Sequence, residues 1–82
     1  MSAPARAKSL LAEAINADAG TVPDEARIGD FEPWDSIAHL RLILSVEEEI
    51  GRQLDPDEAV AIETLRDVAA LIDRGRAAAG KR

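Results

Sequence analysis

Apolar residues near the start of the chain recur at the spacing of one face of an α-helix. They follow the i, i+3, i+4, i+7, i+8 pattern and are Ala7, Leu10, Leu11, Ala14 and Ile15. Pro4 fits the first turn of such a helix, and Gly20 is a residue type that commonly follows a helix end. The pattern predicts a helix over about residues 4–18 with one buried face.

Residues 19–35 show neither helical nor strand periodicity. Four breakers of regular structure interrupt this stretch: Gly20, Pro23, Gly29 and Pro33. A connection of this length in a compact domain is usually either functional or disordered. Apolar residues are nevertheless spread through it: Val22, Ile28, Phe31 and Trp34. We therefore expect an ordered loop whose apolar side chains anchor it to the helices.

A second helix is predicted to begin at Asp35 or Ser36 and to end near Ile50, just before Gly51. Its apolar positions are too many for one stripe: Ile37, Leu40, Leu42, Ile43, Leu44, Val46 and Ile50. Such a helix is central in a bundle or shows an apolar patch to a partner, and we expect both. Three glutamates, residues 47–49, stand where the helix dipole disfavours negative charge. We expect them to form a solvated docking surface rather than a metal site.

Asp55 is the expected N-cap of a short third helix, because Pro56 and Glu58 follow it at the positions of a capping box. The apolar side of this helix is expected to consist of Ala59, Val60 and Ile62.

Thr64 and Asp67 mark the same kind of start for a fourth helix. Its apolar stripe is formed by Leu65, Val68, Ala69 and Ile72, and is widened by Leu71. We expect this helix to fray near Gly75 and residues 76–82 to form a mobile tail.

The predicted elements make an all-α fold, because the sequence contains no internal repeat and no strand pattern. We expect a small four-helix bundle of three main helices and one short helix, with a long loop between helices one and two. One domain is expected over residues 1–82, with an ordered core over about residues 4–75.

The composition narrows the function. The 82 residues include no cysteine and one histidine, which excludes a disulfide framework, a cysteine nucleophile and a histidine-rich metal site. The sequence shows no leader-like segment and no long apolar run, so we expect a cytoplasmic protein without a membrane span. Residues 13–73 hold all sixteen acidic and only four basic residues, a net charge of −12. This charge argues against nucleic acid as a partner and favours basic partner surfaces, although it also serves solubility.

Ser36 is the sharpest candidate for chemistry, because it stands where the aromatic-anchored loop turns into a helix. Its only nearby base is His39, and the sequence offers neither a third catalytic group nor a G-x-S-x-G motif, which argues against a serine hydrolase. A helix N-terminus does stabilise a phosphate, so a serine there can carry a phosphodiester. The alternative is that Ser36 acts only as an N-cap.

Asp35, Ser36 and Ile37 resemble the D-S-L motif of acyl and peptidyl carrier proteins. The resemblance extends over residues 37–50, which are similar to the second helix of that family, and over residues 54–59 and 64–68 at the starts of the next two helices. It covers the chain from the first helix to about Ile72. The combined pattern is far more specific than the three-residue motif.

The resemblance implies that Ser36 is esterified by 4′-phosphopantetheine from coenzyme A, with Asp35 and Ile37 flanking the attachment point. A magnesium-dependent phosphopantetheinyl transferase would add the group. Its thiol would hold acyl or aminoacyl cargo, loaded by a ligase and passed to downstream transferases or synthases. By this resemblance the chain is a monomeric carrier and not an enzyme. The alternative is an acidic helical interaction module without a prosthetic group.

The resemblance also implies a partner surface on the second helix and the loop that enters it. The expected contacts are Trp34, Ala38, His39, Leu40, Arg41, Ile43, Leu44, Glu47 and Glu48. His39 is expected to contact a partner or solvent, and Trp34 to serve as a core anchor or to line the path of the arm. Fatty-acid-synthesis carriers commonly have acids where this chain has Ala38 and Arg41. We therefore expect a carrier dedicated to a specialised pathway.

Overall fold

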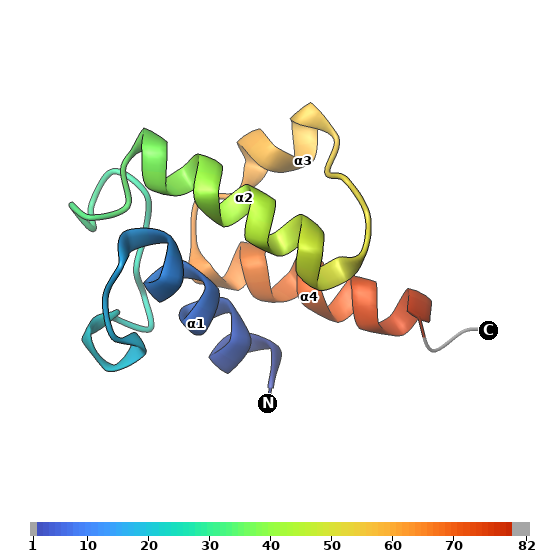
Figure 1. The fold of residues 1–82 in the computed structure, drawn as a ribbon, viewed down its shortest axis with the longest axis horizontal. Helices are drawn as coiled ribbons and strands as arrows, with labels where there is room; N and C mark the ends of the chain where they lie inside the picture. The colour runs from blue at the N-terminus through green and yellow to red at the C-terminus, as the bar shows by residue number, and fades with distance from the viewer. Residues whose placement is uncertain (1, 80–82) are drawn as a thin grey trace.

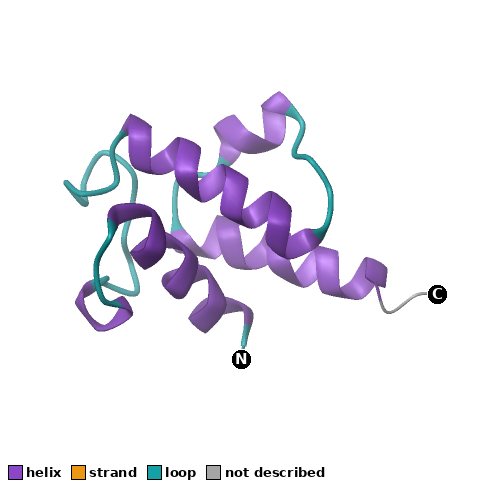
Figure 2. Cartoon of the chain, viewed as in Figure 1, coloured by secondary structure: helices purple, strands orange, loops and turns teal. Residues whose placement is uncertain are grey.

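Four α-helices form the body of the molecule, as the sequence predicts (Figure 1). The computed structural model describes residues 2–79, and Figure 2 shows helices joined by loops within that range. The elements are α1 (Ala3–Ile15), the 3₁₀ turn η1 (Ala19–Thr21), α2 (Ser36–Ile50), α3 (Pro56–Ala61) and α4 (Leu65–Ala79). The prediction of a small all-α bundle with one short helix is therefore confirmed. No helix within residues 2–79 is long and apolar enough to cross a membrane.

Helix α1 begins and ends at polar residues that satisfy its terminal backbone groups. The Ser2 hydroxyl accepts a hydrogen bond from the Ala5 N–H at 3.2 Å. At the other end Asn16 adopts a left-handed conformation with φ 58°, and its N–H bonds back to the carbonyl oxygens of Ala12 and Glu13. The predicted end near residue 18 is wrong, because Asn16 closes the helix before Gly20 is reached.

The loop between α1 and α2 is ordered and apolar on its inner side. Val22 and Trp34 are buried, while Ile28 and Phe31 are half-buried and pack against the core. An isolated β-bridge ties Arg27 to Thr64, at the start of α4. The expectation of a pinned loop is confirmed, although the sequence did not indicate the turn η1 or the bridge.

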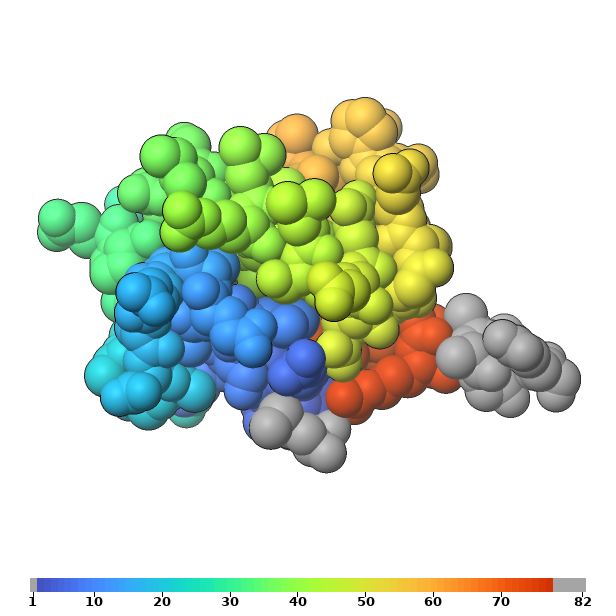
Figure 3. Space-filling view, in the orientation of Figure 1, coloured from blue at the N-terminus to red at the C-terminus, as the bar shows by residue number. Residues whose placement is uncertain are grey.

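Helices α1, α2 and α4 pack together around the core. α1 lies across the front of the bundle, with α2 above it and α4 behind (Figure 1). In the space-filling view the surfaces of α1 and α2 meet along the front face without an open channel between them (Figure 3). The largest fully buried side chains are Trp34, Leu10, Leu11, Leu42, Ile72, Val22, Val46 and Val68.

Helix α4 continues past the point where the sequence predicts fraying. A Cβ atom built on Gly75 would lie 2.8 Å from the Cβ of Ile50 in α2, so the glycine allows the two helices to approach closely. Residues 76–79 of the predicted tail belong to α4. Residues 80–82 lie outside the described part of the chain.

The start of α4 carries the predicted capping pair. The Asp67 carboxylate accepts hydrogen bonds from the backbone N–H groups of Glu63 at 2.8 Å and Thr64 at 3.0 Å. Partial burial of Asp67 opposes ionisation, but these hydrogen bonds outweigh it and lower the pKa of its carboxyl below the usual range. The carboxylate is therefore part of the helix start.

Helix α3 differs from the other helices because none of its own residues is buried. Of its predicted apolar side, Ile62 is buried at the C-cap, Ala59 is half-buried, and Val60 is 81% exposed. The prediction that Val60 packs inward is wrong. At about 100° per residue, Ala59 and Ile62 lie on the same face of the helix, whereas Val60 lies about 200° round from Ile62 and so points away from the core.

Candidate functional site

Ser36 is the first residue of α2, and the helix cap is a different residue. Asp35 is the N-cap, and its Oδ1 accepts a hydrogen bond from the Ala38 N–H at 2.8 Å. The Ser36 side chain is exposed, and its hydroxyl has no hydrogen-bond partner within residues 2–79. The alternative in which Ser36 serves only as an N-cap is therefore wrong, because Asp35 fills that role.

The backbone around Ser36 suits an attached phosphate. The N–H groups of Ser36 and Ile37 belong to the first helical turn, where no preceding turn supplies an acceptor, and they lie at the positive end of the helix dipole. A phosphodiester on the Ser36 hydroxyl would place its negative charge there. The exposed side chain leaves the hydroxyl open to an enzyme that delivers the group.

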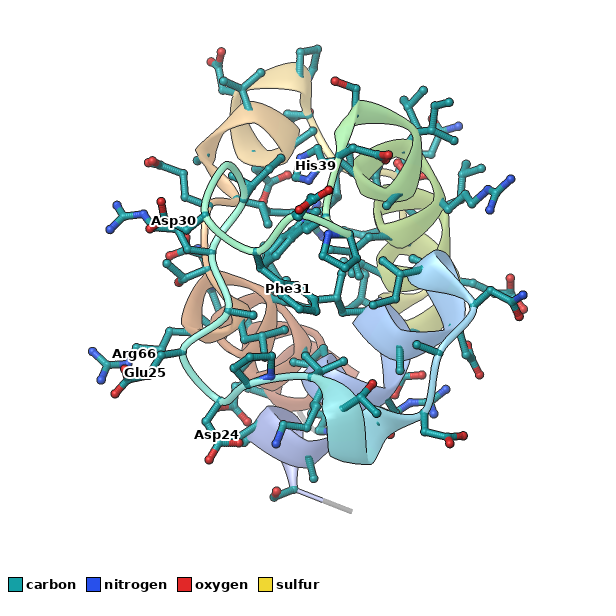
Figure 4. All side chains as sticks on the ribbon, turned by 90° about the vertical axis from the view of Figure 1, so that its left-hand side faces the viewer. Asp24, Glu25, Asp30, Phe31, His39 and Arg66 are labelled. Atoms are coloured by element: carbon teal, nitrogen blue, oxygen red, sulfur yellow. The ribbon has the colours of Figure 1, made fainter. Side chains whose placement is uncertain are left out.

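The loop before Ser36 is held by its aromatic residues. Trp34 is 1% exposed, and its backbone N–H donates to the Phe31 carbonyl at 2.9 Å. In turn the Phe31 N–H donates to the Arg27 carbonyl at 2.8 Å. In Figure 4 the Phe31 side chain lies toward the centre of the molecule, whereas Asp30 points outward. The chain therefore enters α2 from a fixed position, which fixes Ser36 as well.

Both ring nitrogens of His39 are used inside the protein. Nδ1 accepts a hydrogen bond from Trp34 Nε1–H at 3.0 Å, and Nε2 lies 3.1 Å from the Ala59 carbonyl oxygen. The rings of Trp34 and His39 stack, with centroids 6.1 Å apart and an angle of 28° between their planes. His39 therefore has no nitrogen left to accept a proton from Ser36, which removes the base that a serine hydrolase would need. The ring is half-buried, so its predicted contact with a partner or solvent stays a prediction beside these internal contacts.

The structure separates the predicted partner contacts into three groups. Leu40, Arg41, Leu44 and Glu48 are exposed, and so is Ile37, which was expected only beside the cofactor. His39, Ile43 and Glu47 are half-buried. Trp34 and Ala38 are 1% and 4% exposed, so the prediction that they touch a partner has to be corrected.

Two of the three consecutive glutamates have internal partners. The Glu47 carboxylate accepts a hydrogen bond from the Leu54 N–H at 2.8 Å, which fastens the loop that leads to α3. Glu49 pairs with Arg6 of α1 at 3.0 Å. Only Glu48 is fully on the surface. Two of the negative charges at this helix end therefore stabilise contacts with other segments. The helix dipole does not indicate such contacts, because it describes one helix alone.

The exposed apolar residues of α2 form one stripe beside Ser36. Ile37, Leu40 and Leu44 are 63%, 64% and 66% exposed, and the angle of about 100° per residue places them on the same side of the helix. Arg41 lines a surface pocket of about 180 Å³ together with Ile37 and the end of α1. We call Ile37, Leu40, Arg41 and Leu44 the α2 surface.

Val60 is a surface residue that the sequence did not reveal. Among residues 2–79 it is the most exposed of the large apolar side chains, and it lies on α3. Its apolar character alone predicts burial. The signal that could have revealed it is the helical spacing, because Ala59 and Ile62 are three residues apart and share a face that Val60 does not.

Comparisons with known proteins agree with this geometry. The family model described as "Phosphopantetheine attachment site" matches residues 5–72. An acyl carrier protein of Helicobacter hepaticus is 29% identical over 69 residues, which is 84% of this chain and 91% of that protein. An acyl carrier protein of Thermosynechococcus vestitus is 30% identical over 73 residues, 89% of this chain and 90% of that protein.

These matches decide the class of protein. They establish a carrier rather than an enzyme, and they identify its prosthetic group as a covalently attached 4′-phosphopantetheine. The exposed serine at the start of α2 fits such a group. The chain therefore belongs to the phosphopantetheine-binding acyl carrier protein family.

Proposed function

We propose that Ser36 carries the 4′-phosphopantetheine arm. The observation that supports this most directly is the free, exposed Ser36 hydroxyl on the first turn of α2, next to the N-cap Asp35. In the transfer from coenzyme A, the Ser36 oxygen forms a new bond to phosphorus as the adenosine 3′,5′-bisphosphate leaves. The serine proton passes to the transferase, which also supplies the magnesium ion.

The arm would give the protein its only thiol. The chain contains no cysteine, so a thioester has one place to form, at the end of the arm. A thiol without competitors prevents misloading and disulfide exchange within the chain. We infer that acyl or aminoacyl cargo travels on this thiol from a loading ligase to downstream transferases or synthases.

The α2 surface favours a specialised pathway. Ala38 is buried, so its departure from the acidic pattern of fatty-acid-synthesis carriers cannot affect recognition directly. Arg41 is exposed, and within residues 2–79 it has no ion pair. Glu47 and Glu49 are engaged internally. The face next to Ser36 is therefore apolar and locally basic, and we propose partners with an apolar patch and a carboxylate opposite Arg41.

Intact-mass measurement tests the attachment site. The protein is incubated with coenzyme A, magnesium and a broad-specificity phosphopantetheinyl transferase, as wild type, Ser36→Ala and Ser45→Ala. Ser45 lies in the same helix, so it is the matched control. We expect one added phosphopantetheine in the wild type and in Ser45→Ala, and none in Ser36→Ala. Modification of Ser36→Ala would move the site elsewhere. No modification of any variant by several transferases would favour the acidic interaction module.

The predicted cytoplasmic location and monomeric state remain predictions. Both agree with a small carrier that must meet several enzymes in turn, because a free monomer exposes the α2 surface to each of them.

A further inference from the structure

Helix α3 is attached to the bundle mainly by polar contacts. None of its residues is buried, and Ile62 anchors it only beyond its last turn. At its N-terminal end the Arg52 guanidinium donates two hydrogen bonds of 2.9 Å to the carboxylate of Glu58. The Arg52 side chain is exposed and that of Glu58 is half-buried. At its C-terminal end the contact is the one from His39 to the Ala59 carbonyl oxygen. The position of α3 therefore depends on a few individual hydrogen bonds.

The His39 contacts define which nitrogen carries the proton. The indole Nε1–H of Trp34 can only donate, so His39 Nδ1 must accept. The Ala59 carbonyl oxygen can only accept, so His39 Nε2 must donate. Both contacts are satisfied together by the neutral imidazole with its proton on Nε2. Trp34 gains the partner that its buried indole N–H requires.

These contacts join three segments that are separate in the chain. Trp34 belongs to the loop just before Asp35 and Ser36, His39 to the second turn of α2, and Ala59 to α3. We propose that His39 is a positioning residue, which as the neutral Nε2–H tautomer holds α3 against the end of α2 that bears Ser36. Val60, the neighbour of Ala59 on the same helix, is 81% exposed. The expected effect of His39 on phosphopantetheine transfer is the one part of this proposal that rests on the proposed attachment at Ser36.

Two isosteric substitutions separate the two hydrogen bonds. A glutamine amide reaches the position of His Nε2, so His39→Gln keeps a donor for the Ala59 carbonyl oxygen and loses the acceptor for Trp34. An asparagine oxygen reaches the position of His Nδ1, so His39→Asn keeps the acceptor for Trp34 and loses the donor for Ala59. His39→Ala loses both. A purely space-filling role for His39 would not distinguish glutamine from asparagine in this way.

Amide hydrogen exchange by NMR tests the α3 contact. The Ala59 N–H, which bonds to the Asp55 carbonyl oxygen inside α3, reports on that helix. We expect it to exchange about fivefold faster in His39→Asn and His39→Ala, the effect of one neutral hydrogen bond, and near the wild-type rate in His39→Gln. The amides of α1 and α4 serve as controls for global unfolding and should stay unchanged in all three variants.

The indole N–H resonance of Trp34 tests the other contact. It is the only tryptophan in the chain, so its signal is unambiguous. We expect it to keep its wild-type position in His39→Asn and to move in His39→Gln and His39→Ala. The nitrogen shifts of the His39 ring in the wild type should show the Nε2–H tautomer. Equal exchange of Ala59 in all variants, equal acceleration throughout the chain, or the opposite tautomer would overturn the proposal.

The rate of phosphopantetheine transfer supplies the functional readout. We expect the KM of a broad-specificity transferase for the apo-protein to rise about fivefold in His39→Asn and His39→Ala and to stay near the wild-type value in His39→Gln. Unchanged KM in the asparagine and alanine variants would refute the functional consequence. If the wild type is not modified at all, the attachment site is wrong, while the exchange and tautomer results still decide the role of His39.

Discussion

The α1–α4 side and the α2–α3 side of the bundle use their apolar residues differently. On α1 and α4 the large apolar side chains are buried or packed against the core. Within residues 2–79 the exposed large apolar side chains all lie on the other two helices: Ile37, Leu40 and Leu44 on α2, and Val60 on α3. Exposed apolar groups grouped on one side of a small protein indicate a surface that binds other molecules.

Polar contacts occur on both sides: on α1, Arg6 pairs with Glu49 and Lys8 pairs with Asp24. The α1–α4 side depends on close packing, as the approach of Gly75 to Ile50 illustrates where α4 meets α2. On the α2–α3 side, where no residue of α3 is buried, the Glu47 carboxylate accepts a hydrogen bond from the loop, and His39 and Arg52 donate hydrogen bonds to α3. Helix α2 takes part in both roles, because Leu42 and Val46 are buried in the core while its exposed apolar residues stay available for partners. This division fits a carrier that must be rigid enough to fold and open enough to be recognised.

The largest expected effect separates two leucines of the same helix. Leu42 is fully buried and Leu44 is 66% exposed. Leu42→Ala should lower the free energy of unfolding by about 2–5 kcal/mol, because it removes buried methyl groups and leaves a cavity. Leu44→Ala should change it by less than about 0.5 kcal/mol. Urea unfolding followed by circular dichroism measures both.

The same pair should reverse its order in a binding assay. Leu44→Ala should weaken transfer or loading by partner enzymes at a temperature where the variant is fully folded. If Leu44→Ala instead destabilises the fold as much as Leu42→Ala does, the α2 surface is part of the core, and the contrast between the two sides fails.

The next effect concerns the contact between α4 and α2. Gly75→Ala would place a methyl group 2.8 Å from the Ile50 Cβ and should lower the free energy of unfolding by about 1–3 kcal/mol, the usual range for overpacking. Gly20→Ala is the matched control, because a Cβ there meets no atom within 4 Å and the backbone is not left-handed. Thermal unfolding of both variants gives the comparison. A Gly75→Ala protein as stable as the wild type would show that α4 ends before this contact.

Helix starts could be predicted from the sequence, whereas helix ends and contacts between elements could not. The signals at Asp35, Asp55 and Thr64 are local hydrogen-bonding patterns, and each gave the correct start. The end of α1 depended on a left-handed Asn16, a conformation that competes with the more usual glycine. Gly75 was interpreted as a helix terminator, but its absent side chain serves a contact with a helix far away in the sequence.

The candidate site divides in the same way. Ser36 could be predicted, because a loop, an acidic cap and a helix start meet within a few residues. The surroundings of Ser36 could not, since they depend on partners distant in sequence. Glu47 was assigned to the surface, yet it fastens Leu54, and His39 was assigned to solvent or a partner, yet it bridges Trp34 and Ala59.

Charge reversal on the α2 surface should affect recognition and leave the fold intact. Arg41 is exposed without an ion pair in the described chain, so Arg41→Glu should change the free energy of unfolding by less than about 0.5 kcal/mol. Loading by partners that use a carboxylate opposite Arg41 should fall about tenfold, and that loss should shrink at high salt. Arg66→Glu is the control, because Arg66 is equally exposed but lies on α4. Equal losses in both variants would point to net charge rather than to the α2 surface.

The smallest effect should appear in acid, at the ion pair between Arg52 and Glu58. The hydrogen bonds from Arg52, together with the Asp55 N–H, lower the pKa of Glu58 from 4.5 to about 2. Because the pKa is depressed in the folded state, the stabilising contribution is complete above pH 4.5 and is lost as the pH falls toward 2. Both side chains are solvent-accessible, so this contribution to global stability is small and is screened by salt. The chemical shift of the Asp55 amide, followed by NMR, should therefore titrate with a midpoint near pH 2 in the wild type. In Arg52→Gln this midpoint should rise toward 4.5. The methyl signals of Val68 in the core should stay constant over the same pH change. A wild-type midpoint near 4.5 would mean that Arg52 does not hold Glu58 in solution, and that the contacts of His39 and Ile62 position α3 without it.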